Sequence, residues 1–231
     1  MLRRTVMLAA LAACALSNVG AAEAAKPPKP PKPTKPPSSA ANQLTIIAAP
    51  MRVLFGRTTV LSGRLTGPDH AGKVVSVEED GYPFDTFKAL APTATTDANG
   101  DWRLTVQPAL NTRYRAMAKT SPTTTSANIL VQVVKRVSLT ASDRSANRGQ
   151  KITFSGKVSP AHDGQAVVFQ RRSSSGSWVT LRSVVLQDDG AVRSRYTVSM
   201  RVRSTGVYRT VAKADADHGT GKSRALRVTV S

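Results

Sequence analysis

Alternating apolar and polar residues occur in two closely similar stretches of the chain. Residues 56–66 and 149–159 each begin with glycine and contain a Ser-Gly pair followed by a basic residue. Successive side chains of a β-strand point to opposite faces, so this alternation predicts a strand with one buried face. Arg64 and Lys157 are expected on the outer face. The residues expected to face inward are Thr59, Leu61 and Leu65 in the first copy and Ile152, Phe154 and Val158 in the second.

The two copies continue to match beyond this strand. The matching stretches are 72–77 with 164–169, 97–101 with 188–190, 114–119 with 208–213, and 126–133 with 223–230. One pair is a glycine-bearing turn, and the others alternate as strands do. Each copy thus has about seven short strands separated by turns, as in immunoglobulin sandwiches, and no segment has a sustained helical period. The pattern predicts an all-β fold of two tandem immunoglobulin-like β-sandwiches.

These motifs resemble the bacterial immunoglobulin-like repeats of secreted and surface proteins in actinobacteria and their relatives. The resemblance covers residues 44–231 and rests on the Gly-x-x-x-x-x-Ser-Gly strand, the turn glycine, the Tyr-Arg strand and the final Ser-x-x-hydrophobic-x-Val-x-Val strand. It implies that the hydroxyls of Tyr114 and Tyr208 bond to a nearby loop. The chain departs from antibody domains in lacking the two sandwich cysteines. A transthyretin-like sandwich, suggested by residues 96–102, is the alternative fold.

The N-terminal residues predict export. Two arginines precede an apolar run that is too short to span a membrane and is followed by small residues, which indicates a signal peptide over 1–24. Cys14 lies in a Leu-Ala-Ala-Cys context that resembles a lipobox, so lipidation and removal with the signal are both open. Residues 25–43 form a linker rich in proline and lysine. The two sandwiches are expected over residues 44–134 and 135–231, and the protein is expected to be secreted or associated with the cell envelope.

The positive charge is concentrated in the second sandwich. The chain has a net charge of +19, but residues 44–134 hold 9 basic and 7 acidic side chains, whereas residues 135–231 hold 18 and 6. Strand alternation places pairs of arginines on one outer face, and arginine suits phosphate and carboxylate groups. The candidate polyanion-binding residues are Arg171, Arg172, Arg193, Arg195, Arg201 and Arg203. The expected partner is an anionic envelope polymer or surface glycan. Nucleic acid is not expected, and a membrane is expected only through a lipid anchor at Cys14.

No motif for catalysis or for a cofactor is evident. His70, His162 and His218 each lie in a polar loop, and no two of them stand at a metal-binding spacing, so no metal site is expected. Residues 97–101 and 215–219 also contain side chains with potential oxygen ligands, but a tight polar turn accounts for these residues without a metal ion. We therefore expect a non-catalytic binding or adhesion protein. The alternatives are a carbohydrate-binding module that stacks sugars on Trp102 and Trp178, or a structural spacer without a ligand.

Overall fold

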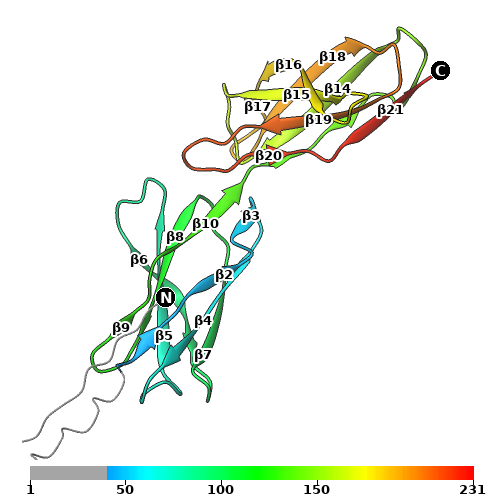
Figure 1. Cartoon of the computed structure of the whole chain (residues 1–231). Helices are drawn as coiled ribbons and strands as arrows, with labels where there is room; N and C mark the ends of the chain where they lie inside the picture. The colour runs from blue at the N-terminus through cyan, green and yellow to red at the C-terminus, as the bar shows by residue number, and fades with distance from the viewer. Residues whose placement is uncertain (1–40) are drawn as a thin grey trace, which may run out of the picture. The chain divides into compact units, whose positions relative to one another are not determined.

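The computed structural model describes residues 41–231 (Figure 1). The predictions for the signal peptide, for Cys14 and for the linker up to residue 40 concern residues outside this part. The described part consists of β-strands, turns and loops, without an α-helix. Accordingly, residues 41–231 contain no helix with the length and apolar character needed to cross a membrane.

The first sandwich contains two sheets built from ten strands. The strands are β1 (Gln43–Leu44), β2 (Ile47–Ala49), β3 (Arg52–Leu54), β4 (Thr59–Thr66), β5 (Val74–Gly81), β6 (Lys88–Thr95), β7 (Asp101–Val106), β8 (Thr112–Ala118), β9 (Thr124–Thr125) and β10 (Ile129–Val134). One sheet has the order β1-β4-β2, with β7 also on β4, and the other has the order β3-β10-β8-β5-β6, with β9 on β8. The first three strands of the chain are thus divided between the two sheets. β1 and β2 pair with β4, whereas β3 pairs with β10 in parallel.

The second sandwich repeats this arrangement. Its strands are β11 (Arg136–Val137), β12 (Thr140–Ala141), β13 (Ser145–Ala146), β14 (Lys151–Ser159), β15 (Ala166–Arg172), β16 (Trp178–Val185), β17 (Gln187–Asp188), β18 (Ser194–Arg201), β19 (Gly206–Ala212), β20 (Gly221–Lys222) and β21 (Leu226–Val230). The sheet orders are β11-β14-β18-β17 and β13-β21-β19-β15-β16. The order β21-β19-β15-β16 corresponds to the G-F-C-C′ order of immunoglobulin sandwiches. The predicted fold class, two tandem immunoglobulin-like sandwiches, is confirmed.

The alternation predicted for the repeated strand is also confirmed. All six residues expected to face inward are buried, and all of them except Thr59 have no exposed surface. Arg64 and Lys157 are exposed on the other face. Each sandwich has its own apolar core between its two sheets.

The repeated Ser-Gly pair has a packing role. Gly63 of β4 lies directly opposite Trp102 of β7, and Gly156 of β14 lies directly opposite Tyr196 of β18. The Tyr196 ring crosses Gly156, and its hydroxyl donates to the carbonyl oxygen of Ser138 at 2.5 Å. A Cβ atom on Gly156 would overlap both Ser138 O and the Tyr196 hydroxyl. The glycine is therefore required because an aromatic side chain passes over it to the next strand.

Among residues 41–231, Tyr196 makes the kind of hydroxyl bond to a loop that the family resemblance implied for Tyr114 and Tyr208. The Tyr114 hydroxyl is buried and has no hydrogen-bond partner among residues 41–231, so the expectation is wrong for this residue. Tyr196 was not singled out from the sequence, because its partner Ser138 lies far from it along the chain.

The buried Tyr196 phenol predicts a loss of stability at alkaline pH. Burial raises its pKa to about 12, whereas an unfolded tyrosine ionises near pH 10. The stabilisation that comes from the protonated Tyr196 phenol is therefore complete below pH 10. It is lost as the pH rises toward 12, and the loss is on the order of 2 kcal/mol. Urea unfolding of Tyr196→Phe should show about 1 kcal/mol lower stability at pH 8 but a smaller further loss above pH 10. An equal alkaline loss in the variant would contradict this, and the half-exposed Tyr82→Phe serves as control.

The outer strands β6 and β16 have the same irregularity. Each is the last strand of its sheet, and the ladder register shifts in the hairpin that joins it to its neighbour, after Ser76 in β5 and after Phe169 in β15. Such a shift is a β-bulge, which bends and twists the strand locally. Pro92 lies within β6, and the exposed Arg182 lies within β16.

Candidate functional site

The arginines predicted along one strand face solvent as expected. Arg195 and Arg201 are exposed on β18, and the exposed Arg193 directly precedes this strand, while Ser194 and Tyr196 between them are buried. Arg195 and Arg201 are six residues apart, which corresponds to about 20 Å along an extended strand. One strand face therefore carries these arginines toward two opposite ends of the sandwich.

At the end near Arg193 the positive charge is partly neutralised. The Asp189 carboxylate forms ion pairs with Arg193 Nε at 2.8 Å and with Lys157 Nζ at 2.9 Å. The close contact with the Lys157 ammonium is the main cause that holds the pKa of Asp189 below its usual range. Arg193 is thus an arginine with an acidic partner, and the same end holds most of the acidic side chains of the domain.

The other four candidate arginines meet at the opposite end. Arg171 and Arg172 close β15, and the Arg171 guanidinium donates to Ser204 Oγ at 2.8 Å and to the Thr205 carbonyl at 3.0 Å, in the loop after β18. Arg203 lies in that same loop. Arg201 ends β18, and its Nη1 donates to the Gly149 carbonyl at 3.0 Å. The structure therefore divides the predicted set into Arg193 and Arg195 at one end and four arginines at the other.

Further cations surround these four arginines. Lys151 is paired with Arg201 across β14 and β18, and Arg227 is paired with Val207 where β19 begins. Arg148 precedes Lys151 in the adjoining loop, and Arg144 lies beside the C-terminal end of β21. We call this surface the basic end; it lies at the end of the sandwich that holds the C-terminus (Figure 1). It consists of Arg144, Arg148, Lys151, Arg171, Arg172, Arg201, Arg203 and Arg227.

The basic end lacks acidic partners. Among the acidic side chains of residues 135–231, Asp143 lies near the basic end. None of the eight cations forms an ion pair among the described residues. The remaining acids are grouped at the other end of the sandwich, in its loops and in the short strand β17. They are Asp163, Asp188, Asp189, Asp215 and Asp217. The second sandwich is therefore electrically polarised along its strands.

A shallow pocket opens at the basic end. It has a volume of about 410 Å³ and is lined by three of the arginines together with hydroxyl and backbone groups. Its lining residues are Arg171, Arg172, Ser173, Ser174, Thr205, Gly206, Val207 and Arg227. Guanidinium groups with neighbouring hydroxyls are donors suited to a phosphate or carboxylate oxygen.

Sequence reasoning missed half of the basic end. Arg144, Arg148, Lys151 and Arg227 come from separate loops and strands, and no local pattern connects them. A usable signal was present, because the repeat alignment places the end of each strand and so identifies which loops share one end. The unequal distribution of acids between those loops would then have been visible.

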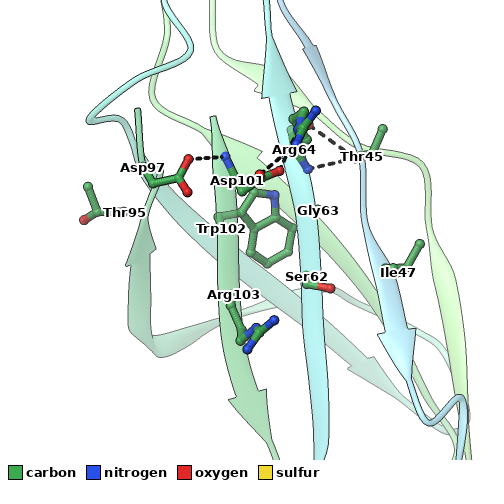
Figure 2. A pocket seen from close by; sticks show the side chains of 10 residues that line it. All are labelled: Thr45, Ile47, Ser62, Gly63, Arg64, Thr95, Asp97, Asp101, Trp102 and Arg103. Atoms are coloured by element: carbon green, nitrogen blue, oxygen red, sulfur yellow. Dashed lines mark hydrogen bonds and ion pairs between the residues drawn. The ribbon is translucent and has the colours of Figure 1, made fainter. Parts of the chain in front are cut away.

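A further pocket lies on the first sandwich (Figure 2). It has a volume of about 730 Å³ and is lined by residues from β4, β7 and the first strands, including Trp102. However, Trp102 is only 3% exposed, since its indole packs into the core opposite Gly63. A sugar needs an open ring face for stacking. The predicted stacking role of Trp102 is therefore not supported.

The rim of this pocket is explained by local bonds. Arg64 makes a two-pronged ion pair with Asp101, at 2.6 and 2.8 Å, and this hydrogen-bonded pair lowers the pKa of Asp101. Asp97 Oδ1 accepts the backbone N–H groups of Asn99 and Asp101. These bonds close a tight turn, which accounts for the oxygen ligands of residues 97–101.

Trp178 is half-buried and already covered. The Arg209 guanidinium lies over its ring, 4.1 Å from the centroid. A sugar would have to displace this cation–π contact from that face. The second predicted stacking residue is thus not an open platform either. Tyr82, at 38% exposure, is the more accessible aromatic, but it lies on the other sandwich.

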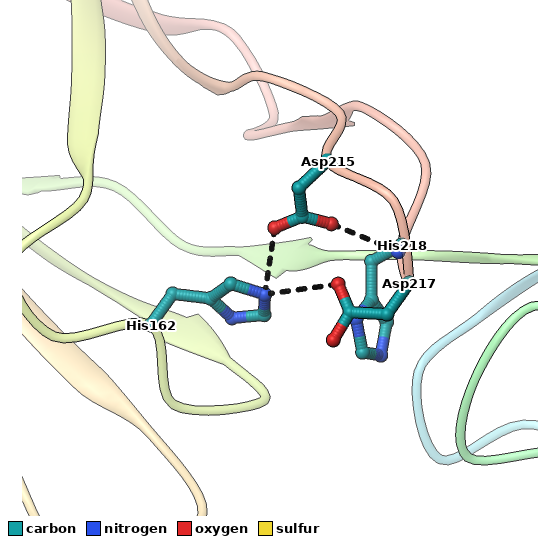
Figure 3. A group of neighbouring side chains, drawn as sticks. All are labelled: His162, Asp215, Asp217 and His218. Carbon is teal, nitrogen blue, oxygen red and sulfur yellow. Dashed lines mark hydrogen bonds and ion pairs between the residues drawn. The ribbon is translucent and has the colours of Figure 1, made fainter. Parts of the chain in front are cut away.

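Two of the three histidines meet in space. His162 and His218 lie beside Asp215 and Asp217 in a group that could hold a metal ion, although they are far apart along the chain (Figure 3). His70 is separate, and its Nδ1 donates to the Gly67 carbonyl oxygen at 2.7 Å. The spacing of the histidines along the sequence therefore did not indicate this cluster.

No protein-family model matches the chain, and the comparison with curated proteins finds no match. Its function has to be inferred from the side chains themselves.

Proposed function

We propose that the protein is an exported, non-catalytic binding protein whose second sandwich docks on an anionic polymer through the basic end. One observation carries this proposal: eight cations gather at one end of a sandwich without an ion-pair partner among the described residues. Uncompensated positive charge of this density attracts polyanions and steers their approach. Export is supported by the basic start and short apolar run of residues 1–24, and it makes an envelope polymer the natural partner.

The side chains favour repeated phosphate or carboxylate groups. Seven of the eight cations are arginines, whose planar fork pairs with both oxyanions in a two-pronged manner. The cations lie on both sheets and on the loops between them, so a single small anion would contact few of them. A polymer with a charge on each repeat unit can contact the pocket at Arg171 and the neighbouring cations together.

A lectin-like function has less support. Trp102 is buried and Trp178 is covered by Arg209, so neither presents a free ring. A spacer without a ligand would explain the two sandwiches, but it gives no reason for acids and cations to lie at opposite ends of one domain.

Binding to inorganic polyphosphate and to polygalacturonate tests the proposal and separates phosphate from carboxylate recognition. We expect binding that weakens at least about tenfold between 50 and 200 mM salt, because several cations release condensed counterions. Changing Arg171, Arg172, Arg201 and Arg203 to serine should weaken binding by a further factor of about ten or more. Isothermal titration calorimetry measures both effects.

A matched variant controls for net charge. Changing Arg182, Arg193, Arg195 and Arg224 to serine removes the same charge from exposed positions outside the basic end. We expect less than about a threefold loss for this control, since distant exposed charges are screened beyond roughly 10 Å. Equal losses in both variants would show that binding follows overall charge, and binding that is insensitive to salt would also overturn the proposal.

A further inference from the structure

The loops at the acidic end of the second sandwich bring four metal-ligand side chains together. His162 lies between β14 and β15, and Asp215, Asp217 and His218 lie between β19 and β20. One ligand atom from each lies within 4.8 Å of all the others. The histidine side chains are 6% and 2% exposed, whereas both carboxylates remain partly accessible. A small ion can thus reach the group through the aspartates.

Each histidine is oriented by a backbone carbonyl. His162 Nδ1 lies 2.9 Å from the Pro160 oxygen, and His218 Nε2 lies 2.9 Å from the Ala109 oxygen. A carbonyl oxygen accepts and never donates, so each of these nitrogens carries the ring proton. In a neutral imidazole the other nitrogen then holds a lone pair. A histidine that binds a metal is commonly fixed in this way by its outer nitrogen.

The two lone-pair nitrogens point at carboxylate oxygens. His162 Nε2 lies 3.0 Å from Asp215 Oδ2 and 3.9 Å from Asp217 Oδ1, and Figure 3 shows it directed between the two carboxylates. His218 Nδ1 lies 3.2 Å from Asp217 Oδ1, is buried, and has no hydrogen-bond partner among the described residues. When both imidazoles are neutral, each nitrogen lone pair faces a carboxylate oxygen, and the two groups repel each other. A cation shared by the four groups turns this repulsion into attraction.

The donor set and the spacing fit a zinc-like ion. Bonds of about 2.0–2.2 Å from histidine nitrogen and aspartate oxygen place tetrahedral ligands roughly 3.3 Å apart. The separations of 3.0, 3.2 and 3.9 Å lie around this value. Calcium and magnesium prefer shells composed of oxygen, so two buried imidazoles disfavour them.

The local charge favours a divalent ion. The two carboxylates contribute two negative charges, and the buried Lys135 ammonium, which donates to Asp215 Oδ2, returns one positive charge. With neutral imidazoles the group is therefore a net anion. We propose that His162, Asp215, Asp217 and His218 bind one divalent transition-metal ion of the Zn²⁺ type.

This ion would fix the loop between β19 and β20. Asn111 donates its backbone N–H to the Asp217 carbonyl at 2.8 Å and its side-chain N–H to the Ala216 carbonyl at 3.2 Å. The same loop thus supplies three of the four ligands and also two acceptors for Asn111 of the first sandwich. Metal binding should therefore protect this loop from hydrogen exchange.

Calorimetric titration of the metal-free full chain with zinc chloride tests the proposal. A Cys14→Ser background removes the one thiol of the chain. We expect one ion per chain with micromolar or tighter affinity, and at least about 100-fold weaker binding in His162→Gln. Asp217→Asn, at a partly exposed position, gives a second variant in case His162→Gln does not fold. His70→Gln, which changes the histidine outside the cluster, should bind as the parent does.

Cobalt substitution provides a second readout. Co²⁺ in a tetrahedral site with two nitrogens and two oxygens should give an intense visible absorption. This absorption should disappear when Zn²⁺ displaces the Co²⁺, and it should be absent in His162→Gln. Absence of binding, unchanged affinity in both His162→Gln and Asp217→Asn, or equal affinity for Ca²⁺ or Mg²⁺ would each overturn the proposal.

Discussion

Gly63→Ala is expected to destabilise the first sandwich by at least about 3 kcal/mol. The new Cβ would overlap the Thr45 carbonyl oxygen and lie 2.9 Å from Trp102 Nε1. Neither neighbour can move freely, because one is backbone and the other is an indole packed in the core. Overpacking a core typically costs about 1–3 kcal/mol. At Gly63 the backbone of Thr45 would have to move away from β4, so we expect a cost at or above the upper end of this range. The melting temperature of the domain should fall by about 12 °C or more.

Gly81→Ala is the matched control in the same sandwich. A Cβ at Gly81 would have Thr112 Oγ1 at 3.9 Å as its nearest neighbour, which is ordinary contact. The control should therefore change stability by less than about 1 kcal/mol. The chain has two tryptophans, one in each sandwich, so a Trp178→Phe background lets Trp102 fluorescence report the unfolding of the first domain alone. Similar melting temperatures for the two alanine variants would refute this account of the repeated glycine.

Lys135→Met is expected to destabilise the second sandwich by roughly 3 kcal/mol. Lys135 is 1% exposed, and its ammonium donates to the Gln165 side chain, the Lys213 carbonyl and Asp215 Oδ2. Burial raises the pKa of Asp215, but hydrogen bonds that include the one from Lys135 outweigh this and hold that pKa below its usual range. Removing one partner of a buried pair strands the other charge, at a cost of about 3–5 kcal/mol. The partial exposure of Asp215 places the loss at the lower limit.

Lys157→Met controls for the loss of a lysine. Its ion pair with Asp189 is half-exposed and should contribute less than about 1 kcal/mol. Hydrogen exchange of the β14 and β18 amides measures the stability of the second sandwich in both variants. Adding Asp215→Asn to Lys135→Met should restore part of the loss, because it removes the stranded charge. Equal effects of the two lysine variants would mean that Lys135 is not an internal ion-pair partner.

The repeat determined how much of the fold could be predicted. Strand period and glycine placement are local properties, so aligning the two copies located the strands and the inward faces correctly. The role of the glycine was not predictable in the same way. It depends on Tyr196 and Trp102, which stand opposite it only after the sheet has formed.

The sites were less predictable because they are assembled from loops. Alternation correctly placed Arg195 and Arg201 on an outer face, but it could not indicate that they lie toward opposite ends of the domain. Arg171 and Arg203 meet only because β15 ends where the loop after β18 begins. Similarly, His162 and His218 belong to different hairpins, and linear spacing carries no information on their distance.

The bulged outer strands have a consequence for folding. Two similar sandwiches in one chain can exchange strands during folding, and neighbouring repeats with high similarity are prone to such misassembly. The hazard is greatest at an open edge such as β16, which exposes Val179, Leu181 and Val185. The bulge twists each edge away from straight pairing, while Pro92 in β6 has no N–H to donate and Arg182 in β16 would place a charge within any new sheet. The two copies therefore keep the same architecture while each remains a poor template for the other.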